Sequence, residues 1–371
     1  MSGSTASARA DSLVLPYNRK YLGSKRQLRE WLADTMCAVA GTPASFVDGF
    51  FGTGSVSLAL ARRGVRRIVA VDNLRSNCVI LRGFTAGSER IPALMDRLNS
   101  VPPVRGYIST HYSGTYFTGE NCRRMDGVRE EIARQFRAGE ISEPEHDILL
   151  ASFLLGADRV ANTIGQYDAF LKNIRGRNLP GGPHLLDNRV RTPFVLQPLD
   201  AIPDTRIEVR EGDMVTLAPG LPADIAYFDP PYNHRQYCDN YHVLENLARW
   251  EKPHLHGKTR KFDRTGLKSP FSRRSGAGDA LRALISGVHA PHVFLSYSSE
   301  GILSRDEIMG ILSARGTAEV TEIPYPVFGN GAGVSRRRNV SEYLFHLAPR
   351  DAGRRDAGPR AATPLHADAV E

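Results

Sequence analysis

Residues 46–55 read FVDGFFGTGS, and this stretch decides the fold. Its first half is apolar, Gly52 and Gly54 follow, and a helix-like run then continues to a suitable C-terminal cap at Gly64. A buried strand that enters a helix through a glycine-rich turn is typical of the first βα unit of a nucleotide-binding sheet. The dinucleotide pattern G-x-G-x-x-G fails at Ser57, which disfavours a nicotinamide cofactor. By themselves, the two glycines fit a tight structural turn almost as well.

Outward from this unit, short apolar runs alternate with helical patterns. The runs that we predict as strands are Phe46–Phe50, Arg67–Asp72, Arg206–Arg210, Asp224–Phe228, His292–Tyr297, Ala318–Ile323 and Ser341–Leu347. The helical patterns are Ser24–Val39, Gly54–Arg63, Asn73–Phe84, Asn240–Trp250, Ala277–Val288 and Ser304–Ala314. This alternation predicts an α/β fold with a mostly parallel, seven-stranded sheet and helices on both faces. The last two strands follow each other directly, which permits an antiparallel hairpin at one edge.

The alternation stops between residues 91 and 204. Two helix-like stretches, Asn121–Arg137 and His146–Ala161, are followed there by a segment rich in Gly, Arg, Asn and Pro at 172–182. An insertion of this size predicts a second, mainly helical domain. The predicted division is a disordered tail at 1–15, an α/β domain made of 16–90 and 205–349, the insertion at 91–204 and a second tail at 350–371.

Composition narrows the class of protein. Lys plus Arg number 48 against 40 for Asp plus Glu, and this balance of +8 suits a polyanionic partner without proving one. The four cysteines are scattered without a CxxC pair, so we expect neither a metal site nor a disulfide framework. No run of about 18 apolar residues and no secretory signal occurs, so we expect a cytoplasmic protein away from the membrane.

The strongest chemical signal is IAYFDPPY at residues 225–232. An apolar strand delivers Asp229 to the carboxyl end of the sheet, where ligands bind in such folds. The prolines fix the backbone and remove two donors, which leaves the Asp229 carboxylate and the Pro230 carbonyl as acceptors beside the ring of Tyr232. Two acceptors beside a flat aromatic ring match an amino group on a planar heterocycle. By accepting hydrogen bonds from that amino group, they would expose the lone pair of its nitrogen. The alternative is an ordinary Pro-Pro turn that closes a strand.

Two further carboxylates follow strand ends. Asp72 ends the second strand, where such folds hold ribose hydroxyls, and Asn73 beside it is a candidate N-cap for the next helix. Asp213 follows the third strand and could accept from a cofactor amino group, although a turn aspartate is an equal alternative.

In this order, the motifs resemble the class D12 family of N6-adenine DNA methyltransferases, over residues 16–347. The resemblance implies a Rossmann-like class I fold that binds S-adenosyl-L-methionine, with the insertion as its target-recognition domain and the motif order of the alpha group. The segment RKYLGSKR at 19–26 looks like the family's N-terminal motif, whose Tyr and Lys hold the methionine end of the cofactor. The implied cofactor-binding residues are Tyr21, Lys25, Asp48, Phe50, Gly52, Gly54, Asp72, Asn73, Asp213 and Asp229. The implied catalytic residues are Asp229, Pro230, Pro231 and Tyr232, with Tyr232 stacked on the base.

The target adenine of such an enzyme lies inside the DNA duplex and must be flipped out. The basic stretch 252–275 is a candidate mobile loop that orders on phosphates, and a solvated surface loop is its alternative. Tyr167 in the insertion is a candidate base or phosphate contact. The candidate DNA-binding cations are Lys172, Arg175, Arg177, Arg235, Lys258, Arg260, Lys261, Arg264, Arg336 and Arg337.

We therefore expect a site-specific enzyme that methylates N6 of adenine in double-stranded DNA. The resemblance is to the restriction–modification branch of the family, so a cognate restriction endonuclease and action as a monomer are further expectations from it. One alternative is an RNA adenine-N6 methyltransferase. Another is a non-catalytic DNA-binding protein on a methyltransferase fold, which is disfavoured because every expected cofactor position carries a competent residue.

Overall fold

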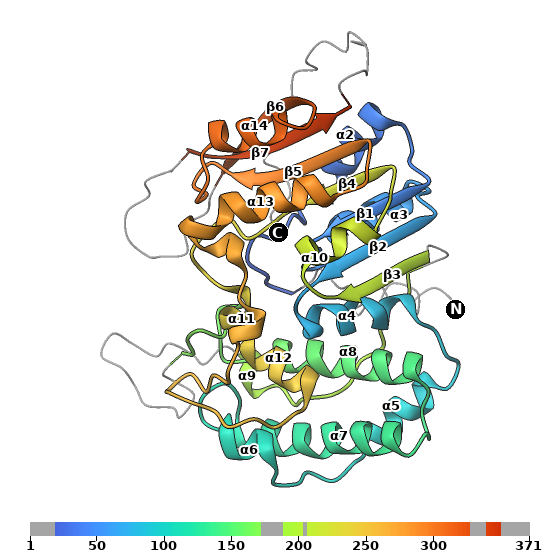
Figure 1. Cartoon of the computed structure of the whole chain (residues 1–371). Coiled ribbons are helices and arrows are strands. Elements are labelled where there is room, and N and C mark those ends of the chain that lie inside the picture. The colour runs from blue at the N-terminus through green and yellow to red at the C-terminus, as the bar shows by residue number, and fades with distance from the viewer. Residues whose placement is uncertain (1–18, 172–187, 203–205, 327–338, 350–371) are drawn as a thin grey trace, which may run out of the picture.

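A seven-stranded sheet forms the upper part of the molecule in Figure 1. The computed structural model describes residues 19–171, 188–202, 206–326 and 339–349. The strands are β1 (Ser45–Gly49), β2 (Arg67–Asp72), β3 (Arg206–Glu211), β4 (Ile225–Phe228), β5 (His292–Ser298), β6 (Thr317–Pro326) and β7 (Asn339–Ala348), in the order β3-β2-β1-β4-β5-β7-β6. All seven predicted strands are confirmed, each with ends within three residues of those expected.

Strand direction also follows the prediction. The strands from β3 to β5 are parallel, whereas β7 runs antiparallel to both β5 and β6 and lies between them. The strand order reverses between β1 and β4, because the chain leaves β1 towards β2 and later returns to the other side of β1. Open α/β sheets bind ligands at such a switch point, beyond the carboxyl ends of the strands.

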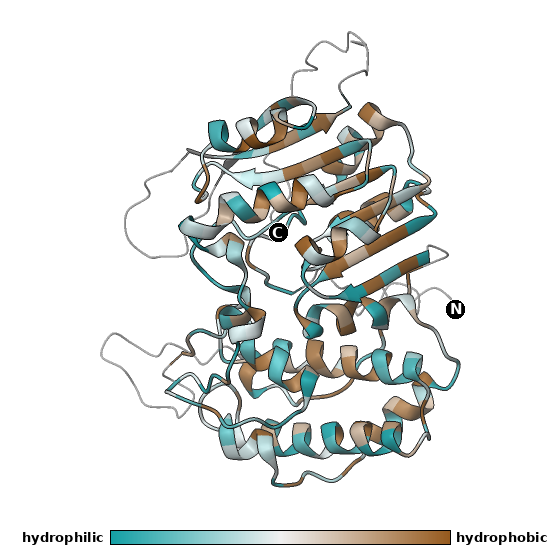
Figure 2. Cartoon of the chain, viewed as in Figure 1, coloured by the Kyte–Doolittle hydropathy of each residue, from teal (hydrophilic) through white to brown (hydrophobic). Residues whose placement is uncertain are grey.

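Helices cover both faces of the sheet. On β1, Phe46 packs with α2 (Arg29–Ala40) and α3 (Ser55–Arg62), while its neighbour Val47 packs with α13 (Arg274–Gly287) on the opposite face. Successive strand residues point to opposite faces, so a strand that is apolar throughout must be covered on both sides. The central strands accordingly carry long brown stretches in Figure 2, with teal near some of their ends. The face with α13 also carries α10 (Met214–Leu217), the 3₁₀ turn η2 (Ala218–Gly220) and α14 (Arg305–Ser313).

Helix α2 begins later than predicted. We expected a helix from Ser24, but residues 19–28 form turns and α2 starts at Arg29. Gly23 in this segment has φ +70°, and a Cβ there would lie 2.8 Å from the Tyr237 hydroxyl. The segment is held against the carboxyl ends of the strands by side chains, so these tertiary contacts override its helical pattern.

A helical unit packs beneath the sheet. It contains α4 (Arg75–Thr85), α5 (Ile91–Asn99), α6 (Tyr107–His111), α7 (Gly119–Arg137), α8 (Glu143–Arg159), α9 (Asn188–Arg191), α11 (Tyr237–Asn240) and α12 (His242–Arg249). One buried cluster joins α4, the insertion and α12, so residues 238–262 contribute to the same core as the predicted insertion. The helix α5 was not predicted, although Ile91, Leu94, Met95 and Leu98 follow a helical spacing. None of the described helices is long and apolar enough to cross a membrane.

Candidate active site

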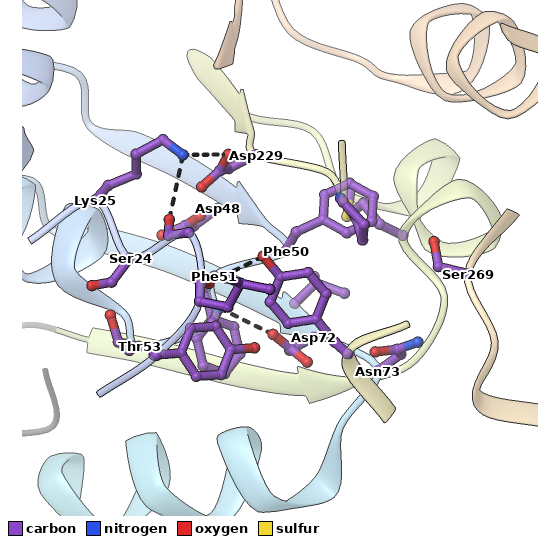
Figure 3. A pocket seen from close by; sticks show the side chains of 18 of the residues that line it. Ser24, Lys25, Asp48, Phe50, Phe51, Thr53, Asp72, Asn73, Asp229 and Ser269 are labelled. Carbon is purple, nitrogen blue, oxygen red and sulfur yellow. Dashed lines mark hydrogen bonds and ion pairs between the residues drawn. The ribbon is translucent and has the colours of Figure 1, made fainter. Parts of the chain in front are cut away.

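A pocket opens at the carboxyl ends of β1, β2 and β4 (Figure 3). It encloses about 850 Å³ of space, its open mouth included. Nine of the ten predicted cofactor residues line it together, and Gly54 does not: the nine are Tyr21, Lys25, Asp48, Phe50, Gly52, Asp72, Asn73, Asp213 and Asp229. The catalytic residues Asp229 and Pro231 also line it, so the structure brings both predicted sets to one place.

The loop after β1 has a backbone that requires glycine. Gly52 and Gly54 have φ of +56° and +71°, and Phe50 also lies in the left-handed region with φ 66°. A Cβ at Gly52 would lie 2.9 Å from a ring carbon of Tyr21, so the ring and the loop are in direct contact. The Gly52 N–H donates to the Asp72 carboxylate at 3.0 Å. Positive φ at the non-glycine Phe50 is a strained conformation of the kind that clusters at ligand sites.

Asp72 is the organising carboxylate of this loop. It accepts from the backbone of Gly52 and Leu74 and from the Asn77 side chain, at 2.9–3.0 Å. Burial raises its pKa to about 6, against the effect of these donors and of Arg19. A carboxylate has about four acceptor positions, so room remains for a ligand hydroxyl.

The predicted N-cap role of Asn73 is wrong. Its side-chain amide donates to the Leu267 carbonyl at 3.1 Å. The first N–H groups of α4, at Arg75 and Ser76, donate instead to both oxygens of the Glu245 carboxylate, at 3.0 and 2.9 Å. Glu245 lies on α12 and is fully buried. A distant carboxylate replaces the local cap because it satisfies two backbone donors at once and opposes the positive end of the helix dipole.

Three tyrosines hold the segment 19–25 in place. The Tyr21 ring stacks on Tyr241 at 4.5 Å between centroids, and Tyr237 lies 5.5 Å away. The Leu22 N–H donates to the Tyr241 hydroxyl at 2.6 Å, and the Tyr237 hydroxyl donates to the Leu22 carbonyl at 3.1 Å. Sequence reasoning gave Tyr237 and Tyr241 no role. The available signal was their position in the segment after the catalytic motif.

The catalytic turn contains an ion cluster. The Lys25 ammonium lies 2.8 Å from Asp229 Oδ1 and 3.2 Å from Glu342 Oε1, and it also donates to the Gly23 carbonyl at 3.4 Å (Figure 3 draws the Lys25–Asp229 contact). The pKa of Asp229 is raised to about 6, chiefly by burial. Glu342 adds to this rise, and Lys25 opposes it. Burial alone would lower the pKa of Lys25, but Asp229 and Glu342 hold it well above its usual value. Sequence reasoning assigned Lys25 to the cofactor and missed Glu342.

Two other acids complete the pocket. Asp48 is 1% exposed and accepts from the Ser57 hydroxyl at 2.5 Å. Burial raises the pKa of Asp48 to about 7. Asp213 is exposed at the rim, and its carboxylate accepts from the Thr216 N–H at the start of α10. With Asp48, Asp72 and Asp229 around one cavity, the site favours a cationic ligand.

The other predicted catalytic residues frame the pocket. Pro230 and Pro231 are buried, and Tyr232 is half-buried with its ring edge-on to Tyr297 at 6.2 Å. Lys25 Nζ lies 5.9 Å from the centre of the Tyr232 ring.

The basic stretch 252–275 is packed rather than loose. It contains two 3₁₀ turns, η3 (Thr265–Leu267) and η4 (Pro270–Ser272), and buries Leu255, Phe262 and Phe271. The expectation of a loop without fixed structure is therefore wrong, because these apolar side chains anchor it to the core.

The candidate cations differ in accessibility. Lys258 and Arg235 are exposed, and Arg235 also donates to the Gln166 side chain at 3.2 Å. Arg264 is 13% exposed and pairs with Asp239 at 2.7 Å, with Lys261 at 3.9 Å from the same carboxylate. Arg260 is half-buried, and its Nε has no hydrogen-bond partner among the described residues. Lys172, Arg175, Arg177, Arg336 and Arg337 lie outside the described residues.

Tyr167 is not a nucleic-acid contact. It is fully buried, and its hydroxyl donates to Asp158 at 2.7 Å. In the described ranges, no group of three or more His, Cys, Asp or Glu side chains could hold a metal ion.

Comparison with known proteins agrees with this geometry. A family model described as D12 class N6 adenine-specific DNA methyltransferase matches residues 21–311. The Type II methyltransferase M.NlaIII of Neisseria lactamica is 33% identical over 345 residues, which cover 88% of this chain and 98% of that protein. M.CviAII of Paramecium bursaria Chlorella virus 1 is 30% identical over 88% of this chain and 97% of its own length. The modification methylase StsI of Streptococcus sanguinis is 33% identical over 65% of this chain and 36% of its own length.

Proposed function

Because the chain belongs to the D12 class N6 adenine-specific DNA methyltransferase family, we propose that it methylates N6 of a flipped-out adenine in double-stranded DNA, with S-adenosyl-L-methionine as methyl donor. The observation that carries this proposal is the position of Asp229. Its half-buried carboxylate follows the end of β4, in the same pocket as the glycine loop and the Asp72 carboxylate. The acceptor for an amine and the loop for a cofactor thus share one cavity.

The pocket chemistry fits this cofactor. S-adenosyl-L-methionine supplies an electrophilic methyl group on a positively charged sulfonium. The acids Asp48, Asp72 and Asp229 offer the negative surroundings that such a cation needs. We assign Asp72 to the ribose hydroxyls, Asp213 at the rim to the adenine amino group, and the Gly52–Gly54 turn to close approach of the ligand.

Asp229 acts on the amine. The lone pair of an exocyclic adenine nitrogen is delocalised into the ring, so the neutral amine is a weak nucleophile. We assign the two N–H groups of that amine to the Asp229 carboxylate and the Pro230 carbonyl, which draw the nitrogen towards tetrahedral geometry. As the new C–N bond forms, the bond from the methyl group to the donor's sulfur would break with its electron pair left on sulfur, and the methylated nitrogen would then release one proton to solvent. We assign the half-buried Tyr232 ring to stacking on the flipped base.

The direct test is transfer of a labelled methyl group to duplex DNA. We expect wild-type protein to label adenine N6 and Asp229→Ala to lose about 10³-fold or more in rate, because it removes a preorganised acceptor. Calorimetry measures the affinity of each variant for the cofactor. An affinity near that of wild type shows that the variant is folded and that its pocket is intact. Label that enters RNA but never DNA would contradict the substrate, and absent cofactor binding would favour the non-catalytic alternative.

The biological setting follows from the relatives. The printed names of the relatives are those of Type II methyltransferases and modification methylases. We propose that this chain is likewise a modification enzyme that acts as a monomer on DNA in the cytoplasm beside a cognate endonuclease. Sequencing host DNA for N6-methyladenine identifies the recognition sequence. Unmethylated or randomly methylated host DNA would overturn site-specific modification.

A further inference from the structure

Glu342 is a largely buried acid to which the proposed function assigns no role. Its side chain is 12% exposed and lies on β7, opposite Ser298 of β5 and Ile323 of β6. Its Oε1 lies 3.2 Å from the Lys25 ammonium and has no hydrogen-bond partner among the described residues. Burial of a carboxylate costs several kcal/mol unless a counter-charge offsets it. Glu342 shares the Lys25 ammonium with the catalytic carboxylate, so it is a candidate for a role in the site.

Lys25 is the link between Glu342 and the catalytic centre. The Lys25 side chain is 7% exposed and has three acceptors around it, which are Asp229 Oδ1, Glu342 Oε1 and the Gly23 carbonyl. The Asp229 and Gly23 oxygens accept hydrogen bonds from the ammonium, whereas Glu342 Oε1 interacts with it as an ion pair. Two acids therefore share one cation, and the cluster of Lys25, Asp229 and Glu342 carries a net charge of −1 when all three are ionised.

We propose that Glu342 is a positioning residue for methyl transfer: it draws the Lys25 ammonium to one side, so that Lys25 occupies only Oδ1 of Asp229 and leaves Oδ2 open for the target amine. The contacts agree with this division, since both the ion pair and the hydrogen bond from Lys25 go to Oδ1. The inference rests on the proposed function, and it adds a residue that acts on Asp229 through their shared contact with Lys25.

The charge balance predicts what each change does. Without the Glu342 charge, Lys25 has Asp229 as its remaining carboxylate and closes on it, so the acceptor is weakened and held in its ionised form. Without Lys25, Asp229 faces Glu342 unscreened and takes up a proton more readily, which converts an acceptor into a donor. The two changes therefore shift the ionisation of Asp229 in opposite directions.

Other groups also face this cluster and are kept constant in the test. Around Asp229 and Lys25 they are Asp48 at the end of β1, Tyr227 on β4, Tyr232 in the catalytic turn, Tyr237 on α11 and Glu300 after β5. All of the tyrosines have a pKa raised by burial and stay neutral near pH 7. Asp48, with its pKa raised by burial to about 7, is the neighbour that titrates in the same range. The comparison is therefore repeated in an Asp48→Asn background.

The experiment measures single-turnover methylation of duplex DNA as a function of pH. We expect Glu342→Gln to lower the rate about tenfold to a hundredfold, with cofactor affinity within about threefold of wild type. Its acid limb should move to lower pH, and that of Lys25→Met to higher pH. Glu342→Asp should restore part of the rate. Glu322→Gln, an exposed acid on the neighbouring strand β6, is the matched control and should behave as wild type.

Several results would overturn the inference. They are a Glu342→Gln rate within twofold of wild type, acid limbs that move in the same direction, or a loss of cofactor affinity that accounts for the loss of rate. If wild-type protein methylates no DNA, the proposed function fails instead. The effect of Glu342 on Asp229 is then measured by carbon-13 NMR titration of the Asp229 carboxyl. This carboxyl should titrate at lower pH in Glu342→Gln than in wild type. An unchanged titration would overturn it.

Discussion

At the residue scale, buried carboxylates in the site lower the stability of the folded protein when they are ionised. Asp48 is 1% exposed, and burial is the main reason that its pKa rises to about 7. A raised folded-state pKa means that the folded protein binds more protons than the unfolded chain between about pH 4 and pH 7. Stability from this group is therefore greatest at low pH and is lost as pH rises through the folded pKa.

Asp48→Asn should stabilise the protein without ligand, and more at pH 8 than at pH 5. Asparagine keeps an acceptor for the Ser57 hydroxyl but removes the buried charge. We expect a gain of roughly 2–4 kcal/mol at pH 8 from the linkage, measured by urea unfolding. Asp279→Asn, on an acid with a 79% exposed side chain, is the control and should change little at either pH. A gain that is the same at both pH values would show that burial of charge is not its cause.

At the element scale, α4 and α8 pack closely against each other at Gly83. Gly83 on α4 faces α8, and a Cβ there would lie 2.9 Å from the Asp147 carbonyl and closer still to the Ala151 side chain. One of these contacts is with backbone, which cannot rotate away. The two helices approach closely only because position 83 has no side chain.

Gly83→Ala should therefore lower the free energy of unfolding by about 1–3 kcal/mol through overpacking. Gly310→Ala is the matched control, because Gly310 lies within α14 with open space around it. There the same change should stabilise by roughly 0.5–1 kcal/mol, since alanine is the better helix former. Equal effects at the two sites, measured as urea midpoints, would mean that α4 and α8 can separate at little cost.

The elements were largely predictable from the sequence, because strands buried on both faces are read from local apolar runs. The local sequence pattern did not predict the ends and caps of helices that are set by contacts with residues distant in the sequence. The start of α2 depends on contacts of Lys25 and its neighbours with the strand ends, and the cap of α4 comes from Glu245. Likewise, Lys25 and Asp229 are 204 positions apart. The sequence alone does not say which distant residues lie side by side, so it cannot indicate that Glu342 joins them.

At the scale of the whole molecule, buried charges connect the helical unit to the sheet. Glu245 on α12 accepts from the Arg75 and Ser76 N–H groups at the start of α4 and from Arg249 at 2.7 Å. Arg249 also pairs at 2.8 Å with Glu211, the last residue of β3. The start of α4 is thus fixed by α12, and α12 is fixed in turn to the end of β3 through Arg249.

DNA affinity at this scale depends on which cations are free to meet phosphates. Lys258 is exposed, whereas Arg264 is 13% exposed, pairs with Asp239 and lies over the Phe262 ring. Lys258→Ala should weaken DNA binding and reduce the slope of log K against log salt by about 1, with an unchanged Tm. Arg264→Ala should lower the Tm, because it unpairs Asp239 and uncovers Phe262, and should leave the salt slope near wild type.

Fluorescence anisotropy with a duplex oligonucleotide at several salt concentrations gives these slopes, and thermal unfolding gives the Tm. The opposite pattern, a reduced slope in Arg264→Ala with an unchanged Tm, would mean that the Arg264–Asp239 pair opens on DNA. The stretch 252–275 would then change conformation on binding despite its buried apolar anchors, because a guanidinium paired to a carboxylate cannot also neutralise a phosphate without leaving that partner.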